Sequence, residues 1–566
     1  MSSSPNEELT SSDGQFRIGY ASDIEGHWDY FLDYVSRSNV LDWESVPSSK
    51  EPKHNFHRLA LRPNTYFVFG GDSVDKGPGD IRFTSAMVDL KQRYPDRVHL
   101  LVGNRDLNKI RFQTELGEYE MSLPVEMIEK PFWDANAMSY KEFLQKKSDG
   151  LAIEEMNTKV NKLKWMLDHT LGCPETFEFR RQEIGILKQI YGHYPLNYDS
   201  DVDFHSTVLN EVEVDPSIAT DEQVVQSFEH EINHQMGSLR QYLKHASIAA
   251  IIGNTIFVHG AIDVLTMKFV PSLESKFERP SAPPVSLTNL VTMTSTNAEL
   301  YEETMIENDE WVDSLNNFLH HGLKDFEERP NWNAERTSRG GEALLAIQNR
   351  PSMWGRSVVC NSYGDGGVIA TSTSQAEQMN ALKTSVANAD PLVFEGTASN
   401  VFDPKPAKWL SDQGIRRIVV GHKPTGDCPS VLSAEYTGVE VVSADTSYSH
   451  RKELDVFEHP FGVCRGAAIS LVEIVGTAHS NWLETSGSLA CGRQYNDRFQ
   501  VLSPVNCVPA SEFGGGDHNL GKRLPDGWWV KAAISPDQYH LCRGSGRIVE
   551  YEIRSRNDVT MQLSNI

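Results

Sequence analysis

Short apolar runs that end abruptly in charged or amide residues are the feature of this sequence that most constrains its fold. Three of them stand near the start of the chain: FRIGYASD at 16–23, YFVFGGD at 66–72 and VHLLVGNRD at 98–106. Apolar runs of this length are typical of buried strands, and polar residues directly after them are typical of loops that carry function. The pattern predicts a sheet whose strand ends deliver ligands to a common site.

Five further runs extend this pattern toward the C-terminus. IAAII and TIFVHG flank Gly253 and Asn254, which predicts a hairpin with an Asn-containing turn. RRIVVGH, EVVSAD and AISLVEIV follow at 416–422, 440–445 and 468–475. All of them are predicted to be sheet strands.

The residue composition between these predicted strands divides the chain into regions. Long polar stretches with helical spacing predict a helical insertion at about 107–246, and DEWVDSLNNFLHHGLKDF predicts an amphipathic helix in a second insertion at about 271–350. After residue 475 the chain turns Gly-rich and then gives strand-like runs such as GWWVKAAI and RIVEYEIR. We therefore expect a disordered tail at 1–15, a main domain at 16–475 and a β-rich C-terminal extension at 476–566.

Charge and composition limit the function classes. The 53 basic and 78 acidic residues give a net charge of −25, which disfavours non-specific binding to nucleic acid or to anionic membranes. The net charge is still compatible with a local pocket that binds a phosphorylated small molecule, nucleotide or phosphoprotein. We expect a soluble, cytoplasmic protein, because no stretch approaches the roughly 18 apolar residues of a membrane span, the N-terminus lacks a signal pattern, and the seven cysteines form no C-x-x-C pair.

Five short polar segments, each at a predicted strand end, carry the candidate chemistry. They are Asp23-Ile-Glu25-Gly, Gly71-Asp72-Ser-Val-Asp75-Lys76-Gly, Gly103-Asn104-Arg105-Asp106, Val258-His259-Gly and Gly421-His422-Lys-Pro. In this order the segments resemble the motif set of the calcineurin-like metallophosphoesterases, closest in look to the phosphoprotein phosphatase and diadenosine tetraphosphatase branch. The resemblance covers roughly residues 16–110, 246–265 and 415–475.

The resemblance implies a fold and a metal-dependent phosphatase activity. The fold is a four-layer α/β/β/α sandwich, and the activity uses a water activated by two divalent ions, of manganese, iron, magnesium or zinc. Two ions about 3.5 to 4 Å apart need a bridging carboxylate and a mixed oxygen and imidazole shell. The implied bridge is Asp72; the implied ligands of the first ion are Asp23 and Glu25, and those of the second ion are Asn104, His259 and His422.

Three cations are candidates for holding the phosphoryl group of the substrate. Lys76 stands where the family usually has arginine, Arg105 follows the motif asparagine, and Arg356 lies in Ser-Met-Trp-Gly-Arg. Lysine binds phosphate as a point charge and arginine does so with two parallel hydrogen bonds. The alternative is that these are ordinary surface cations.

Two departures from the family pattern bear on catalysis. Glu25 replaces a histidine ligand, which gives the first ion three carboxylates and favours magnesium, manganese or iron over zinc. Arg105 replaces the histidine that protonates the leaving group with help from Asp75, and arginine is no proton donor near neutral pH. Unless His27 or another side chain replaces that acid, a slow enzyme, one restricted to good leaving groups, or an inactive binding or scaffold protein is expected.

A competing motif lies in the helical insertion. His230-Glu231-Ile-Asn-His234 matches the H-E-x-x-H pattern of zinc metalloproteases, in which one helix face presents both imidazoles and the glutamate acts as base. Arg240 stands where the longer form of that motif has its third histidine. The surrounding stretch is typical of an ordinary amphipathic helix, so a protease is the minor alternative.

Overall fold

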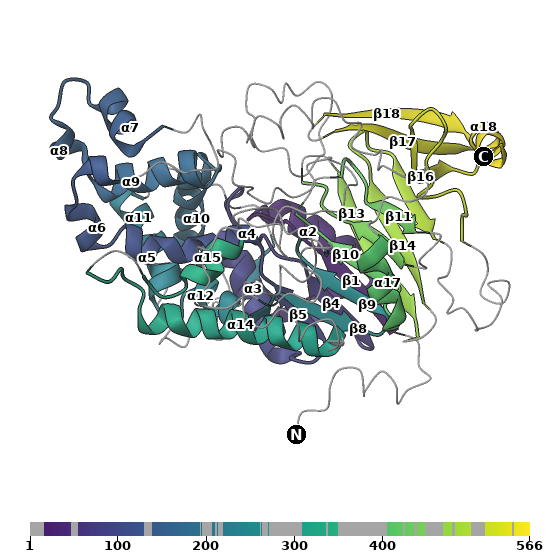
Figure 1. Ribbon diagram of the computed structural model, residues 1–566, viewed down its shortest axis with the longest axis horizontal. Helices are drawn as coiled ribbons and strands as arrows, with labels where there is room; N and C mark the ends of the chain where they lie inside the picture. Colours follow the sequence, from purple (N-terminus) through teal and green to yellow (C-terminus); the bar gives the residue numbers. More distant parts are fainter. Residues whose placement is uncertain are drawn as a thin grey trace, which may run out of the picture.

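The structure is a computed structural model, in which sheets lie at the centre, most helices at one end and a small C-terminal sheet at the other (Figure 1). It describes residues 16–46, 55–128, 138–192, 194, 206–209, 212, 219–260, 262, 270, 308–334, 338–348, 404–422, 425–434, 439–447, 468–477, 481–499, 516–545 and 548–565. The predicted tail at 1–15 and the candidate Arg356 lie outside these residues.

A seven-stranded sheet carries three of the five polar segments. Its spatial order is β15-β14-β13-β1-β4-β5-β7, and β1, β4, β5 and β7 run parallel while β13, β14 and β15 are antiparallel to their neighbours. The strands are β1 Phe16–Ala21, β4 Thr65–Phe69, β5 Val98–Leu101, β7 Ala246–Ser247, β13 Ile469–Gly476, β14 Asn481–Ser488 and β15 Gln494–Arg498. Because β1, β4 and β5 are parallel, their carboxyl ends meet at one edge.

A five-stranded sheet carries the two histidine segments. Its order is β11-β12-β10-β9-β8, with β9, β10 and β12 parallel and the outer strands antiparallel to their neighbours. The strands are β8 Ala249–Ile252, β9 Thr255–Val258, β10 Arg417–Val420, β11 Ser430–Ala434 and β12 Val439–Ser443. The predicted hairpin around Gly253 and Asn254 is confirmed as β8 and β9; β11 was not predicted.

The two sheets pack face to face, and alternate residues along their strands show it. Val68 of β4 and Phe257 of β9 lie in one apolar cluster between the sheets, together with Tyr20, whose ring stacks on Phe257 at 5.9 Å between centroids. Their neighbours Phe67 and Val258 point away from that layer into another cluster. A two-residue period of this kind fixes which face of each strand is buried between the sheets.

Helices cover the outer faces of both sheets and complete the predicted four-layer sandwich. α2 Trp28–Arg37 and α3 Asp80–Arg93 pack against the seven-stranded sheet. α14 Asn308–Glu328 and α17 Pro404–Asp412 cover the five-stranded sheet, where their rings Trp311 and Trp409 meet edge to face at 5.3 Å. The amide of Asn316 in α14 bonds the backbone of β8, which fixes that helix on the sheet.

The region between β5 and β7 is mainly helical (Figure 1, blue). Its helices are α4 Asn104–Leu107, η1 Asn108–Ile110, α5 Arg111–Glu115, α6 Glu118–Ser122, η2 Val125–Met127, α7 Tyr140–Lys147, α8 Ile153–Met156, α9 Lys159–Trp165, η3 Met166–Thr170, α10 Thr176–Tyr191, α11 Asp221–Asn233 and α12 Ser238–His245. α15 Glu342–Gln348 lies against α4 and α14. This region has its own apolar cluster, which includes Phe112, Trp165 and Phe228.

The stretch after residue 475 begins with strands of the main sheet. β14 pairs with β13 over its whole length, so these residues extend the seven-stranded sheet. Among the described residues of this stretch, β16 Trp529–Ser535, β17 Gln538–Ser545 and β18 Ile548–Ser555 form a separate sheet, which is followed by α18 Arg556–Ser564. A further small sheet, β2 Leu41–Val46, β3 Phe56–Leu61 and β6 Thr207–Val208, was not predicted. Among the described helices, none has the length and apolar character that crossing a membrane requires.

Candidate metal centre

The loops that follow β1 and β4 are joined by backbone hydrogen bonds. The amides of Asp23, Glu25 and Gly26 donate to the carbonyls of Gly71, Asp72 and Ser73 at 2.9 to 3.0 Å. Gly71 has φ 93, and a Cβ on it would lie 2.6 Å from the amide nitrogen of Gly103. Only glycine allows the loops after β4 and β5 to approach this closely, so the first three polar segments form one rigid surface.

Backbone strain is concentrated at the predicted site. Seven non-glycine residues in the described chain have positive φ, and five of them are site residues: Asp23, Glu25, Asp72, Asp75 and His422, with φ between 50 and 113. Such conformations cost about 1 to 3 kcal/mol each and persist where the surrounding structure holds them.

Asp106 holds the Asp72 loop against the loop after β5. Its carboxylate accepts hydrogen bonds from the amides of Asp72 (2.9 Å), Ser73 (2.8 Å) and Gly103 (2.8 Å), and from the Ser73 hydroxyl. Burial and the charge of Asp72 raise the pKa of Asp106 to about 6. The sequence motif contained Asp106, but no role was predicted for it.

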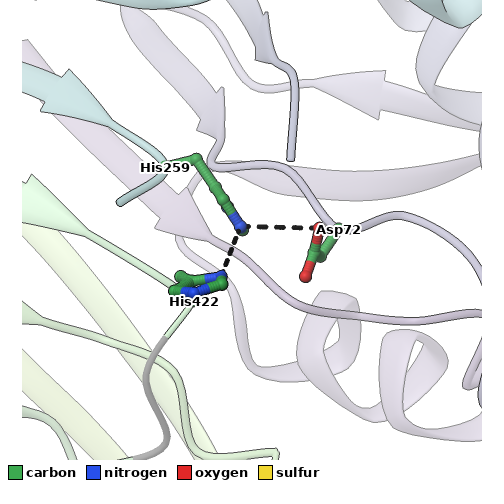
Figure 2. Close-up of side chains that lie close together, drawn as sticks. All are labelled: Asp72, His259 and His422. Carbon is green, nitrogen blue, oxygen red and sulfur yellow. Dashed lines mark hydrogen bonds and ion pairs between the residues drawn. The ribbon is translucent and has the colours of Figure 1, made fainter. Parts of the chain in front are cut away.

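Four donor atoms meet around the imidazole of His259, at the end of β9. Its Nε2 lies 3.4 Å from Asp72 Oδ1, 3.3 Å from Asn104 Oδ1 and 3.2 Å from His422 Nδ1. Figure 2 shows three of these side chains converging from the two sheets. Ligand atoms around one ion with bonds of about 2.1 Å are spaced by about 3 to 3.5 Å, and the three distances from His259 Nε2 lie in this range. The donor atoms of Asp72, His259 and His422 all lie within 4.8 Å of one another, so these residues could hold one divalent ion.

The surroundings of His259 fix which nitrogen is available. Its Nδ1 lies 2.7 Å from the carbonyl of Gly70, so Nδ1–H donates there and Nε2 faces Asp72. Burial lowers the pKa of His259, but the charges of Asp72 and Asp23 and the hydrogen bonds to Asp72 and Gly70 together outweigh it and raise the pKa to about 10. For Asp72, burial is outweighed by His259, Arg105 and His422, which hold its pKa below the ordinary value. A metal ion bound at Nε2 would take the place of the proton that the charged imidazole carries on this nitrogen.

Asp23, predicted to bind the first ion, supports the histidine loop. Both of its carboxylate oxygens accept from the backbone amide of His422, at 3.1 and 3.0 Å. Burial and the charge of Asp445 raise the pKa of Asp23 well above its ordinary value. A Cβ on Gly421 would lie 2.4 Å from Asp23 Oδ2, so this approach also requires glycine.

Glu25, the other predicted ligand of the first ion, is engaged by two cations. Its Oε1 lies 2.8 Å from Lys76 Nζ and 2.7 Å from Arg105 Nε. Arg105 Nε also lies 3.7 Å from Asp72 Oδ2, which places the guanidinium between the two carboxylates. Glu25 and Lys76 are buried, at 3% and 5% exposure, so the interpretation of Lys76 as a surface cation is wrong. The described residues therefore fit the second predicted ion and do not fit the first.

Asp75 also binds two cations. Its Oδ2 lies 3.2 Å from Arg105 Nη1 and 2.7 Å from the Nζ of Lys109. Lys109 is 2% exposed and also donates to Arg105 O (2.9 Å) and Asn108 Oδ1 (2.7 Å). Sequence reasoning missed Lys109; its position four residues after Arg105, one helical turn further on, was the available signal.

The H-E-x-x-H segment does not form the geometry of a protease site. The helix predicted through this stretch ends at Asn233, and His234 has an extended backbone with ψ 136. The Glu231 carboxylate turns to the start of α12, where it accepts from the amide and hydroxyl of Ser238, both at 2.6 Å. A Cβ on Gly237 would lie 2.4 Å from Glu231 O, so a larger residue would not fit at this position between α11 and α12.

One other group of described residues has metal-ligand chemistry. Asp427, Cys428 and His540 are buried, and their donor atoms lie within 4.8 Å of one another between the β11 loop and β17. His540 Nε2 lies 3.0 Å from Asp427 Oδ1. Cys428 also packs with apolar residues such as Leu489 and Ala532, which is the ordinary setting of a structural cysteine.

Comparison with known proteins supports the resemblance over a short segment. No family model matches the chain. Over 48 residues it is 42% identical to the Saccharomyces cerevisiae serine/threonine-protein phosphatase PP2A-like PPG1; this is 8% of the chain, which spans 13% of the length of that relative. The expected similarity to serine/threonine phosphatases is confirmed to that extent.

One solved structure with similarity is a protein serine/threonine phosphatase from Saccharomyces cerevisiae, itself described as similar to human phosphatase PP5. The likeness covers 81% of this chain and 72% of that chain, at 10% identity and a TM-score of 0.28. A score this low carries no weight for the fold, which rests on the strand pairing and packing described above.

Proposed function

We propose that this protein is a metal-dependent phosphoric ester hydrolase that attacks its substrate with water. The observation that carries the proposal is the convergence of Asp72, Asn104, His259 and His422 from four separate segments onto one point, with ligand-like spacing. The short phosphatase match supports it. Phosphoproteins, dinucleoside polyphosphates, nucleotides and small phosphometabolites all remain candidate substrates.

The donor set suits a divalent ion of the first transition row. One carboxylate, one amide and two imidazoles are ligands that manganese, iron and zinc accept. Such an ion supplies a bound water of lowered pKa and positive charge for the phosphoryl oxygens. Gly70 O fixes the tautomer of His259, Asp23 orients the backbone at His422, and Asp106 fixes the Asp72 loop.

Protonation of the leaving group is the step that these residues support least. Arg105 occupies the position of the family's acid, and its guanidinium keeps its proton near neutral pH. Asp75, which would orient a histidine there, is bound to Arg105 and Lys109. Aryl phosphates, whose departing oxygen needs no proton, should therefore be hydrolysed faster than alkyl phosphates.

Hydrolysis of an aryl phosphate by metal-free protein reloaded with Mn²⁺, Mg²⁺, Fe²⁺ or Zn²⁺ tests the proposal. His259→Ala should lower kcat/KM by about a thousandfold because a ligand is lost, whereas His57→Ala, on β3, should have no effect. Arg105→Ala should lower kcat by about tenfold to a thousandfold if Arg105 also contacts the phosphoryl group. Arg105→His should help alkyl phosphates most.

The alternative is a binding or scaffold protein with little or no catalysis. It is favoured by the engagement of Glu25 and Asp75 with buried cations. Protein that binds an ion at His259 yet hydrolyses neither kind of ester would support this alternative and refute the hydrolase.

A further inference from the structure

We propose that this centre holds one divalent ion, on Asp72, Asn104, His259 and His422, and that the cations of Arg105 and Lys76 permanently take the place of the other predicted ion, the one assigned to Asp23 and Glu25. The inference rests on the proposed function in that it concerns the same site. It departs from the two-ion site that the sequence motifs imply.

The contacts of Glu25 carry the first step. Arg105 Nε approaches both Glu25 (2.7 Å) and Asp72 (3.7 Å), the two carboxylates that would face the first predicted ion. Lys76 Nζ binds the same Glu25 oxygen at 2.8 Å. A guanidinium is always charged, so it neutralises these carboxylates at every pH at which the protein is folded.

The anchoring of the cations carries the second step. Arg105 is held at its guanidinium by Asp75 (3.2 Å) and at its backbone carbonyl by Lys109 (2.9 Å). Its amide also donates to Asp72 Oδ1 at 2.9 Å. An ion entering beside Glu25 would have to separate Lys76 and Arg105 from this buried carboxylate, and breaking a buried ion pair is strongly unfavourable.

The charge balance carries the third step. The carboxylates Glu25, Asp72 and Asp75 each form an ion pair with at least one of the cations Lys76, Arg105 and Lys109. A divalent ion beside Glu25 would therefore enter a place where the carboxylates are already paired and where it would be repelled by Lys76 and Arg105.

Counting Mn²⁺ ions on the full-length protein tests the proposal without measuring activity. Metal-free protein is titrated with Mn²⁺ by calorimetry and by electron paramagnetic resonance, in a Cys428→Ser background so that the Asp427, Cys428 and His540 group is not counted. The expected result is one ion per chain with the spectrum of an isolated Mn²⁺. Two ions per chain with a spin-coupled spectrum would overturn the proposal.

Variants identify which residues set the count. Glu25→Gln should leave one ion bound, because Glu25 is no ligand, whereas His259→Ala should abolish binding. The double variant Glu25→His with Arg105→His, checked for folding by circular dichroism, should accept a second, spin-coupled ion. A count that stays at one in a folded double variant, or a loss of the ion in Glu25→Gln, would contradict the role given to these cations.

The outcome separates this inference from the proposed hydrolase. One bound ion without ester hydrolysis would refute the hydrolase and leave the one-ion centre intact. Two coupled ions with hydrolysis would do the reverse. No ion bound at all would overturn both.

Discussion

Strand β5 and the loop that follows it are built on opposite principles, although they are adjacent in sequence. Val98, Leu100 and Leu101 are almost fully buried and contribute to both apolar layers of the sandwich. This loop consists of Gly103 and the first residues of the short helix α4, and it instead presents the amide of Asn104, the guanidinium of Arg105 and the carboxylate of Asp106 to other polar groups. The strand stabilises the fold, and the loop holds polar and charged groups of the site in place.

The largest effect on stability is expected in the strand. Leu101→Ala removes a fully buried side chain between the sheets and should lower the free energy of unfolding by about 3 kcal/mol. The site residues keep their own contacts, so activity per folded molecule should change little. Urea unfolding and an aryl phosphate assay measure the two quantities. Leu151→Ala, at a leucine that is 56% exposed, is the matched control and should change the free energy by less than about 0.5 kcal/mol. Equal losses of unfolding free energy in Leu101→Ala and Leu151→Ala would contradict the stabilising role given to the strand.

In the loop, Asp106→Asn should affect the site more than the fold. Asparagine keeps one acceptor oxygen, and its amide group faces backbone N–H donors that Asp106 now binds. The Asp72 loop should shift, lowering kcat by about tenfold to a hundredfold and weakening Mn²⁺ binding. Kinetics and calorimetry provide the measurements, with Asp33→Asn on the exposed face of α2 as control. Unchanged ion affinity would mean that Asp106 does not position Asp72.

The smallest effect should be a pH dependence that originates in the strand. Burial and the charge of Lys91 lower the pKa of His99 to about 3. Between that value and the ordinary pKa of about 6.5, the unfolded chain binds a proton that the folded chain does not, so stability falls as pH decreases. Through His99, lowering the pH from 7.5 to 5.5 should lower the free energy of unfolding by about 1.4 kcal/mol. Urea unfolding at both pH values should show that the free energy of unfolding of His99→Gln changes by about 1.4 kcal/mol less than that of the unsubstituted protein. An identical pH dependence would place the titration elsewhere.

Much of the framework was predictable from local pattern. The runs at 16–23, 66–72 and 98–106 are strands followed by polar loops, as expected. The break between α11 and α12 was missed because apolar spacing continues across it, while the cap that Glu231 gives to Ser238 depends on a chain reversal. β14 was assigned to an extension because its sequence shows strand character without showing which sheet it joins.

The sequence by itself determined which residue types stand at the strand ends, and hence that Asp72, Asn104, His259 and His422 were candidate ligands. That information is local, since apolar runs and glycines specify strands and tight turns wherever they occur. Only the tertiary structure decided that Glu25 binds Lys76 and Arg105, and that Asp75 binds Lys109. A carboxylate can bind a metal ion or an organic cation equally well by its chemistry. Which of the two it binds depends on the groups that the fold brings within about 3 Å, and residues far apart in sequence supply those groups.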